Sequence, residues 1–284
     1  MTIPVKERGL VYYYLRSTSG IVGAVLLFLM IAVSLASFFK FTPHDPLYQD
    51  IENLLKPPSS TFWFGTDNFG RDVFSRTIDG MRRSLTVSIT AVAIATFVGV
   101  LLGVVAGFVG GWFDQFIARV SDVLFSFPAI LLALAIVSSL GNDWYDTAFA
   151  IAIVYTPIFV RVARGPVLTV KEMDYIKASR ILGYSTPRII WKHVFPNITA
   201  PVIVQIALSL SWAILTESGL SFLGLGTQPP NASLGLMVAE AQPIAAFAWW
   251  NLAFPSIFIT IVVVGLNLVG DGLRDALDPA RRSS

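Results

Sequence analysis

Thirty consecutive residues without a charge, SLTVSITAVAIATFVGVLLGVVAGFVGGWF, run from Ser84 to Phe113. A membrane core about 30 Å thick is crossed by about 20 helical residues, so this stretch is long enough to span it. The stretch therefore predicts a transmembrane helix, and the rest of the sequence is interpreted from that starting point.

The composition of the whole chain is also typical of a membrane protein. Apolar residues make up 55% of the 284 residues and charged residues only 13%, whereas a soluble domain carries about 25% charged residues. The basic residues are spread along the chain, so no nucleic-acid interface is predicted. The absence of cysteine and the presence of only two histidines exclude thiolate and histidine metal clusters, and no metal site is predicted.

Charge-poor stretches predict six transmembrane helices in all. The stretches cover residues 17–39, 84–113, 123–142, 147–164, 194–216 and 241–270. The fourth is the weakest, because Arg161 follows a short apolar run and must reach the membrane interface. A re-entrant segment is the alternative there.

Six spans place both termini on the same side of the membrane. The segments that would share this side hold 14 of the 20 lysines and arginines, and the short loops on the other side hold none. The positive-inside rule then places both termini in the cytoplasm. The opposing observation is the long outer segment 40–83, which carries the other six basic residues together with six acids.

This topology divides the chain into five parts. They are a cytoplasmic N-terminal segment at 1–19, a first transmembrane helix at 20–39, an extracytoplasmic loop at 40–83, a core with five transmembrane helices at 84–272, and a cytoplasmic tail at 273–284. Four prolines exclude a long helix from the first part of the loop. Residues 68–83 are predicted to form an amphipathic helix, and a solvated surface loop is the alternative.

Small residues mark one face of the second span. Glycines recur every four residues at Gly99, Gly103, Gly107 and Gly111, which places them on the same side of a helix. Small side chains let a second helix approach closely, so this face is predicted to be a helix-packing surface.

The inner segment 161–196 is too long and too basic to be a simple turn between spans. Pro166 suits a helix start, Gly183 suits a helix end, Thr186-Pro187 suits a second helix start, and Pro196 marks the next break. The segment is therefore predicted to be a helix-turn-helix on the cytoplasmic face. A docking element for another protein and a plain surface helix both remain open.

Residues 174–197 resemble a known sequence pattern, the EAA loop of ABC importer permeases. That pattern reads Glu-Ala-Ala, three residues, Gly, nine residues and Ile-x-Leu-Pro. Here Lys177-Ala178-Ser179 occupy the first positions, Gly183 matches the glycine, and Pro196 closes the pattern at the correct spacing. Lys177 replaces the family's acidic residue, which changes any contact carried by that carboxylate.

Three further segments resemble the permeases of the dipeptide, oligopeptide and nickel importers, and in particular their second, C-type subunit. The segments are FGTDNFGRDVFSR at 64–76, SGLSFLGLGTQPP at 218–230 and GDGLRDALDP at 270–279. The likeness extends from about residue 20 to residue 280, and the motifs follow one another in the family's order.

The resemblance implies an all-α integral membrane subunit that forms half of an ATP-driven import pore in the bacterial cytoplasmic (inner) membrane, with peptides as the expected cargo and nickel, sugars or other small solutes as alternatives. It also implies four kinds of contact: a homologous second permease, two ATP-binding subunits, an extracytoplasmic substrate-binding protein and membrane lipid. The chain lacks the Gly-x-x-x-x-Gly-Lys-Ser/Thr phosphate-binding motif, so it is expected to bind no cofactor and to be no enzyme. ATP and magnesium are expected in the partner subunits.

Two groups of residues are candidate functional sites. Lys177, Ala178, Ser179 and Gly183 are implied by the resemblance to contact the ATPase subunits. Polar residues within the predicted spans are candidates for the translocation pathway, with Glu217 foremost because the stretch 194–239 is otherwise uncharged. Gln205 and Asn267 are the other two, with hydrogen bonding between helices as the alternative role.

Other classes of membrane protein fit less well. A stand-alone secondary transporter or channel is the main alternative, although no internal repeat is visible. An intramembrane serine hydrolase lacks a histidine base in the spans, and Leu268-Val-Gly-Asp271 lacks the first glycine of the aspartyl protease motif.

Overall fold

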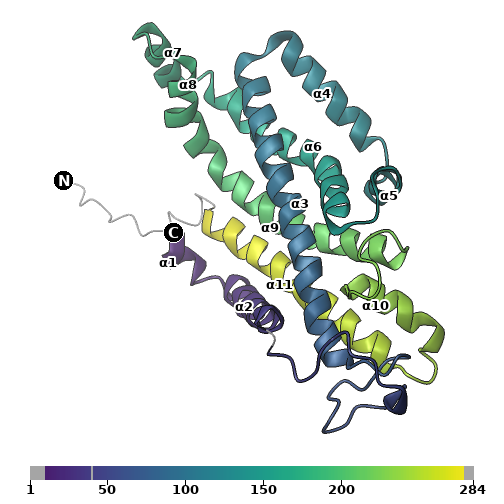
Figure 1. Ribbon diagram of the computed structural model, residues 1–284. Coiled ribbons are helices and arrows are strands. Elements are labelled where there is room, and N and C mark those ends of the chain that lie inside the picture. Colours follow the sequence, from purple (N-terminus) through teal and green to yellow (C-terminus); the bar gives the residue numbers. More distant parts are fainter. Residues whose placement is uncertain (1–9, 40, 278–284) are drawn as a thin grey trace.

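The computed structural model describes residues 10–39 and 41–277, and these residues are predominantly helical (Figure 1). An isolated bridge between Thr66 and Asp72 is the β-pairing found in this part of the chain. The helical elements are α1 Leu10–Tyr14, α2 Thr18–Phe38, η1 Ile51–Asn53, α3 Val73–Val109, α4 Gly111–Phe125, α5 Ala129–Leu140, α6 Trp144–Val170, α7 Asp174–Ile181, α8 Thr186–Ile189, η2 Ile190–Val194, α9 Phe195–Phe222, α10 Leu234–Ala241, η3 Gln242–Ile244 and α11 Trp250–Leu277.

Five helices are long and apolar enough to cross a membrane. They are α2, α3, α6, the continuous run 186–222 that ends with α9, and α11. The pair α4 and α5 also passes the test when taken together, which gives up to six crossings among the described residues. In Figure 1, α7 and α8 lie at one end of the bundle, and α10 and the segment 41–72 lie at the other.

The third predicted span, 123–142, is wrong as a single straight helix. Its residues fall on two helices, α4 and α5, that are bent by 95°. The cause is Pro128, which stands at the N-cap of α5 with an extended ψ of 129°. Proline disfavours helical backbone at the residue before it, so the helix ends within the Ser126-Phe127-Pro128 sequence.

The fourth predicted span, in contrast, is part of one continuous helix. α6 has 27 residues and includes Pro157 and Pro166 in its interior. The re-entrant alternative therefore does not describe residues 147–164. The prediction of a helix start at Pro166 is also wrong, because the helix runs past this residue to Val170.

Residues 73–83 of the predicted amphipathic helix 68–83 and residues 84–109 of the second span form one helix, α3. Residues 68–72 are not helical, and residues 111–113 belong to α4. The carboxylate of Asp72 accepts a hydrogen bond from the backbone N–H of Ser75 and so caps the first turn. With 37 residues, α3 is about 55 Å long, which exceeds the thickness of the membrane core. One end of α3 therefore extends beyond the apolar layer.

Glycines of α3 make its close contact with α6. A Cβ atom added at Gly99 would lie 2.5 Å from the Cβ of Phe159, and one at Gly103 would lie 2.5 Å from the backbone oxygen of Val160. A Cβ at Gly107 would also meet α6, at Val167. Gly111 has no neighbour within 4 Å and does not share this contact. It adopts a φ of 66° at the turn between α3 and α4, a conformation that glycine accepts without strain.

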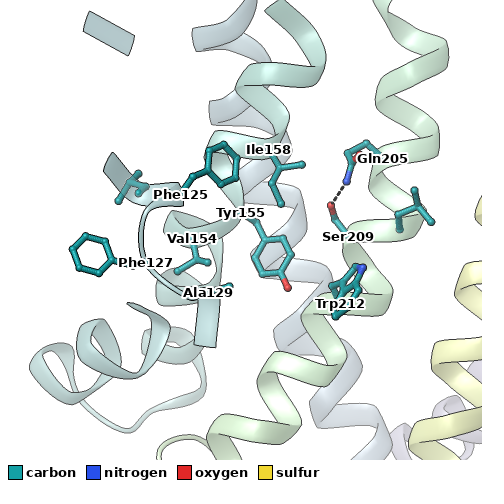
Figure 2. A pocket seen from close by; sticks show the side chains of 11 residues that line it. Phe125, Phe127, Ala129, Val154, Tyr155, Ile158, Gln205, Ser209 and Trp212 are labelled. Carbon is teal, nitrogen blue, oxygen red and sulfur yellow. Dashed lines mark hydrogen bonds between the residues drawn. The ribbon is translucent and has the colours of Figure 1, made fainter. Parts of the chain in front are cut away.

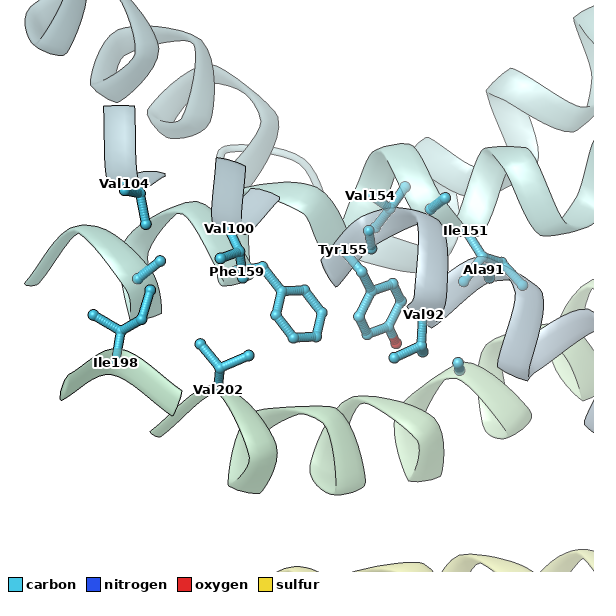
Figure 3. Packing of buried hydrophobic residues seen from close by; sticks show 14 of the residues in the cluster. Ala91, Val92, Val100, Val104, Ile151, Val154, Tyr155, Phe159, Ile198 and Val202 are labelled. Atoms are coloured by element: carbon cyan, nitrogen blue, oxygen red, sulfur yellow. The ribbon is translucent and has the colours of Figure 1, made fainter. Parts of the chain in front are cut away.

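The main apolar core lies between α3, α6 and α9. Figure 3 shows Phe159 and Tyr155 of α6 between valines of α3 and residues of α9 such as Val202. Phe159 is fully buried. Lipid is as apolar as these side chains, so close packing rather than exclusion from water stabilises this contact.

The first and last spans pack against each other beside this core. A Cβ atom at Gly23 of α2 would lie 2.7 Å from the Cβ of Leu268 in α11, and Gly20 lies directly against Gly272. The sequence reading did not single out these glycines, because their partners are more than 200 residues away along the chain.

Candidate functional site

Residues 174–189, called the coupling segment below because they include the residues predicted to contact ATPase subunits, form two short helices at one end of the bundle (Figure 1). α7 ends at Ile181, and Gly183 then adopts a φ of 77°, which ends the helix with a left-handed residue. Ser185 is the N-cap of α8, one residue before the predicted Thr186, and Pro187 lies in its first turn. Residues 174–189 therefore form the predicted helix-turn-helix, although it begins eight residues after Pro166.

One face of this helix pair is anchored in the core. Ile176 of α7 is fully buried, Ile189 of α8 is 1% exposed, and both belong to the apolar cluster between α3, α6 and α9. The guanidinium of Arg180 lies 5.0 Å from the ring centroid of Phe108 in α3. The side chains of Ile176 and Arg180 therefore connect α7 to the spans beneath it.

The other face of the pair is exposed, with charged residues such as Lys177 along α7 and apolar residues at its tip. Ile181 is 87% exposed and Leu182 is 73% exposed, and both precede Gly183 at the tip of the segment. Of the four predicted contact residues, Lys177, Ala178 and Gly183 are exposed. Ser179 is buried and donates a hydrogen bond to the backbone oxygen of Tyr175 at 2.7 Å, so it does not belong to the same surface.

The coupling segment continues into the fifth span without a break. Residues 190–194 form a π-helical turn, and α9 follows directly with Pro196 in its first turn. The prediction of a helix break at Pro196 is wrong, because proline is tolerated in the first turn of a helix, where its missing N–H is not needed. The π-helical turn widens the backbone just ahead of this residue.

A cavity of about 330 Å³ opens where α4 and α5 are bent against α6 and α9 (Figure 2). Its wall is mostly apolar, with polar groups from Gln205, Ser209, Tyr155 and Trp212. The Gln205 side chain donates a hydrogen bond to the hydroxyl of Ser209 at 3.1 Å. Small-molecule sites in proteins have this combination of apolar walls and a few polar groups.

The other two pathway candidates lie between helices. Glu217 is 1% exposed and accepts hydrogen bonds from Ser221 at 2.9 Å and Ser218 at 3.5 Å. The side-chain amide of Asn267 in α11 donates to the hydroxyl of Ser211 in α9 at 2.9 Å. In the described chain neither residue lines the cavity of Figure 2. Glu217 also hydrogen-bonds with Ser84 of α3 and Ser233 before α10, so both residues connect elements of the bundle.

The opposite end of the bundle holds a buried ion-pair network that the sequence reading missed. Arg71 and Arg76 both bind Glu240 of α10 at 3.2 Å, and Arg71 also binds Asp67 at 2.6 Å. The side chain of Arg76 is only 1% exposed. The network joins the start of α3 to α10, and its only sequence signal was the FGTDNFGRDVFSR motif, which contains Asp67 and both arginines.

Metal binding has no visible basis in residues 10–39 and 41–277. No three histidine, aspartate or glutamate side chains come together there as metal ligands would.

Comparison with known proteins agrees with this arrangement. Residues 99–283 match the family described as "Binding-protein-dependent transport system inner membrane component". The chain belongs to this family. It is a multi-pass membrane permease subunit of a transport system.

Named permeases resemble almost the whole chain. It is 42% identical to the dipeptide transport system permease protein DppC of Alkalihalophilus pseudofirmus over 94% of this chain and 88% of that protein. It is 43% identical to the di/tripeptide transport system permease protein DppC of Pseudomonas aeruginosa, over 91% and 88%. It is also 43% identical to the glutathione transport system permease protein GsiD of Shigella flexneri, over 89% and 84%.

Proposed function

We propose that this permease forms half of the pore of an ATP-driven importer of small peptides in the bacterial inner membrane. The peptide cargo is supported by three relatives whose names specify dipeptides, di- and tripeptides, and glutathione. Both termini face the cytoplasm in this proposal, as does the helix pair α7–α8.

The observation that carries the proposal is that α7 has one buried face and an exposed apolar tip. Its inner face is anchored in the core by Ile176, and the tip beyond it exposes Ile181 and Leu182. An exposed apolar surface on a polar segment is typical of a protein–protein contact. A partner ATPase subunit is the protein expected to cover it, because the chain has no nucleotide-binding motif of its own.

In this proposal, movement of the ATPase subunits is passed through α7 to the spans, and this movement drives transport. When two ATPase subunits close on each other, they carry α7 with them, and the buried contacts of Ile176 and Ile189 move α3, α6 and α9 as a unit. The equilibrium between inward-open and outward-open states shifts only because the closed ATPase pair binds one of them more tightly. Lys177, Ala178 and Gly183 lie on the docking surface, and Ser179 supports it from beneath.

The pathway role is assigned to the cavity at the α4–α5 bend. Gln205 presents an amide to this cavity, which suits the peptide groups of a cargo, and the aromatic rings of Tyr155 and Trp212 suit its side chains. Glu217 and Asn267 hold helices together in this proposal.

Purification from the native membrane in mild detergent, followed by mass spectrometry, tests the proposal. Recovery of a related permease and two nucleotide-binding subunits with the tagged chain is the expected result. Recovery of this chain alone, with transport that does not require ATP, would replace the proposal with a stand-alone transporter or channel.

A further inference from the structure

A second cavity, of about 350 Å³, lies at the end of α6 that is remote from α7. It is formed where the outer part of α3 meets the loop before α6 and the segment between α9 and α10. Its wall is predominantly polar, in contrast to the cavity of Figure 2. The residues that matter below are Arg82, Arg83, Asn142, Asp143, Gln228 and Asn231.

One side of this outer pocket carries excess positive charge. Arg82 and Arg83 both pair with a single carboxylate, that of Asp79, at 2.8 Å and 2.9 Å. Each arginine side chain is 31% exposed, and neither pairs with a second carboxylate among the described residues. Two guanidinium groups that share one anion leave one positive charge and several N–H donors for a ligand carboxylate.

The pocket also contains a carboxylate and three amides. Asp143 accepts a hydrogen bond from the hydroxyl of Tyr145 at 2.6 Å and pairs with no cation in the described chain. The amide nitrogen of Gln228 is used by the backbone oxygens of Gly224 and Gly226, which leaves its oxygen as an acceptor toward the pocket. Asn142 and Asn231 add groups that can both donate and accept.

We propose that this outer pocket binds the two charged ends of a short peptide. Arg82 and Arg83 bind the terminal carboxylate, Asp143 binds the terminal ammonium group, and the amides bind the peptide bond between them. The volume lies at the low end of the range of about 300–1,000 Å³ seen for small-molecule sites, which limits the ligand to a few residues. This inference rests on the proposed function and adds a site within the permease that recognises the ends of the cargo.

The pocket is tested by direct binding, without the substrate-binding protein. The purified permease–ATPase complex in nanodiscs is titrated with radiolabelled dialanine, with its C-terminal amide and with its N-acetyl form. Dialanine is expected to bind at least about tenfold more tightly than either blocked form, because each blocked form loses one charge-assisted contact. Absence of saturable dialanine binding up to millimolar concentration would overturn the inference.

Variants assign each contact. Arg82→Gln with Arg83→Gln is expected to abolish the preference for dialanine over its amide and to keep the preference over N-acetyl-dialanine. Asp143→Asn is expected to do the reverse, and Arg119→Gln, an exposed arginine on α4, is expected to change neither. If the arginine variants keep both preferences, the inference is wrong.

A third measurement distinguishes failure of the pocket proposal from failure of the proposed function. It also tests whether the pocket instead docks the substrate-binding protein. ATP-driven uptake by proteoliposomes is followed with and without the substrate-binding protein. ATP-dependent uptake by the unaltered complex, together with loss of dialanine selectivity in the arginine variants, supports both proposals. If the arginine variants take up peptide normally and keep their preference for dialanine, the pocket proposal is wrong and the proposed function stands. If the arginine variants lose only the stimulation of ATPase activity by the binding protein, the pocket is a docking surface for that protein and the peptide site is wrong.

Discussion

The two ends of the bundle are constructed in opposite ways. At the α7 end, Ile181 and Leu182 are exposed on a segment whose other face is buried in the core. At the α10 end, charged side chains are buried and paired, with Arg76 only 1% exposed. The first end has an apolar surface left to be covered by a partner, and the second is closed on itself by contacts within the chain. In the proposed function, therefore, the α7 end depends on a partner for its burial, whereas the α10 end is held by ion pairs within the chain.

The largest expected effect is at the outer end. Arg76→Ala leaves Asp67 and Glu240 with a single arginine between them, and removal of one partner from a buried ion pair destabilises a protein by about 3–5 kcal/mol. We expect a strong loss of folded protein in the membrane, measured by fluorescence size-exclusion chromatography and thermal unfolding in detergent. Arg119→Ala is the control, and equal stability of the two variants would show that the network does not close this end.

A smaller effect is expected at the helix contact that joins the two ends. A Cβ at Gly99 would lie 2.5 Å from the Cβ of Phe159, so Gly99→Val must separate α3 from α6 and destabilise the fold by about 1–3 kcal/mol. Thermal unfolding in detergent measures this. Gly165→Val on α6 is the matched control, because nothing lies within 4 Å of its added Cβ. A destabilisation as large for Gly165→Val would contradict the packing argument.

At the coupling end the effect is on function rather than on folding. Gly183 has open space around it and a φ of 77°, so Gly183→Val strains the backbone by about 1–2 kcal/mol and displaces the tip of α7–α8. We expect normal membrane insertion with reduced ATP-dependent uptake. Gly183→Asn is the control, since asparagine adopts left-handed backbone more readily. Full uptake by the valine variant would show that the conformation of Gly183 is not needed for ATP-dependent uptake.

The smallest expected effect is at Asn267. Its amide bonds Ser211 across the α9–α11 contact, and such bonds between membrane helices contribute about 0.6 kcal/mol on average. Asn267→Leu is therefore expected to lower thermal stability slightly and to leave the affinity for peptide unchanged. A large rise in the KM of uptake would return this residue to the translocation pathway.

Much of the fold was predictable because charge-free length and glycine spacing report on local structure. The runs that became α2, α6 and α9 are each continuous helices, whereas the last predicted span, 241–270, is helical as α11 only from Trp250, because η3 and a turn come first. Gly183 marks a helix end through its own backbone requirement. The bend at Pro128 was missed because apolar composition alone does not distinguish a straight span from a broken one. The roles of Glu217 and Arg76 depend on partners far away in the chain, Ser84 and Glu240 among them, and local sequence patterns carry no information about such contacts.

The central claim is that the exposed tip of α7–α8 transmits the movement of a partner to the spans. The most direct test replaces Ile181 and Leu182 with serine and measures ATP hydrolysis and peptide uptake in the same proteoliposomes. We expect the variant permease to be stable and correctly inserted, but to lose the ATPase subunits or to hydrolyse ATP without uptake. Unchanged uptake per ATP hydrolysed, with the ATPase subunits still bound, would contradict it.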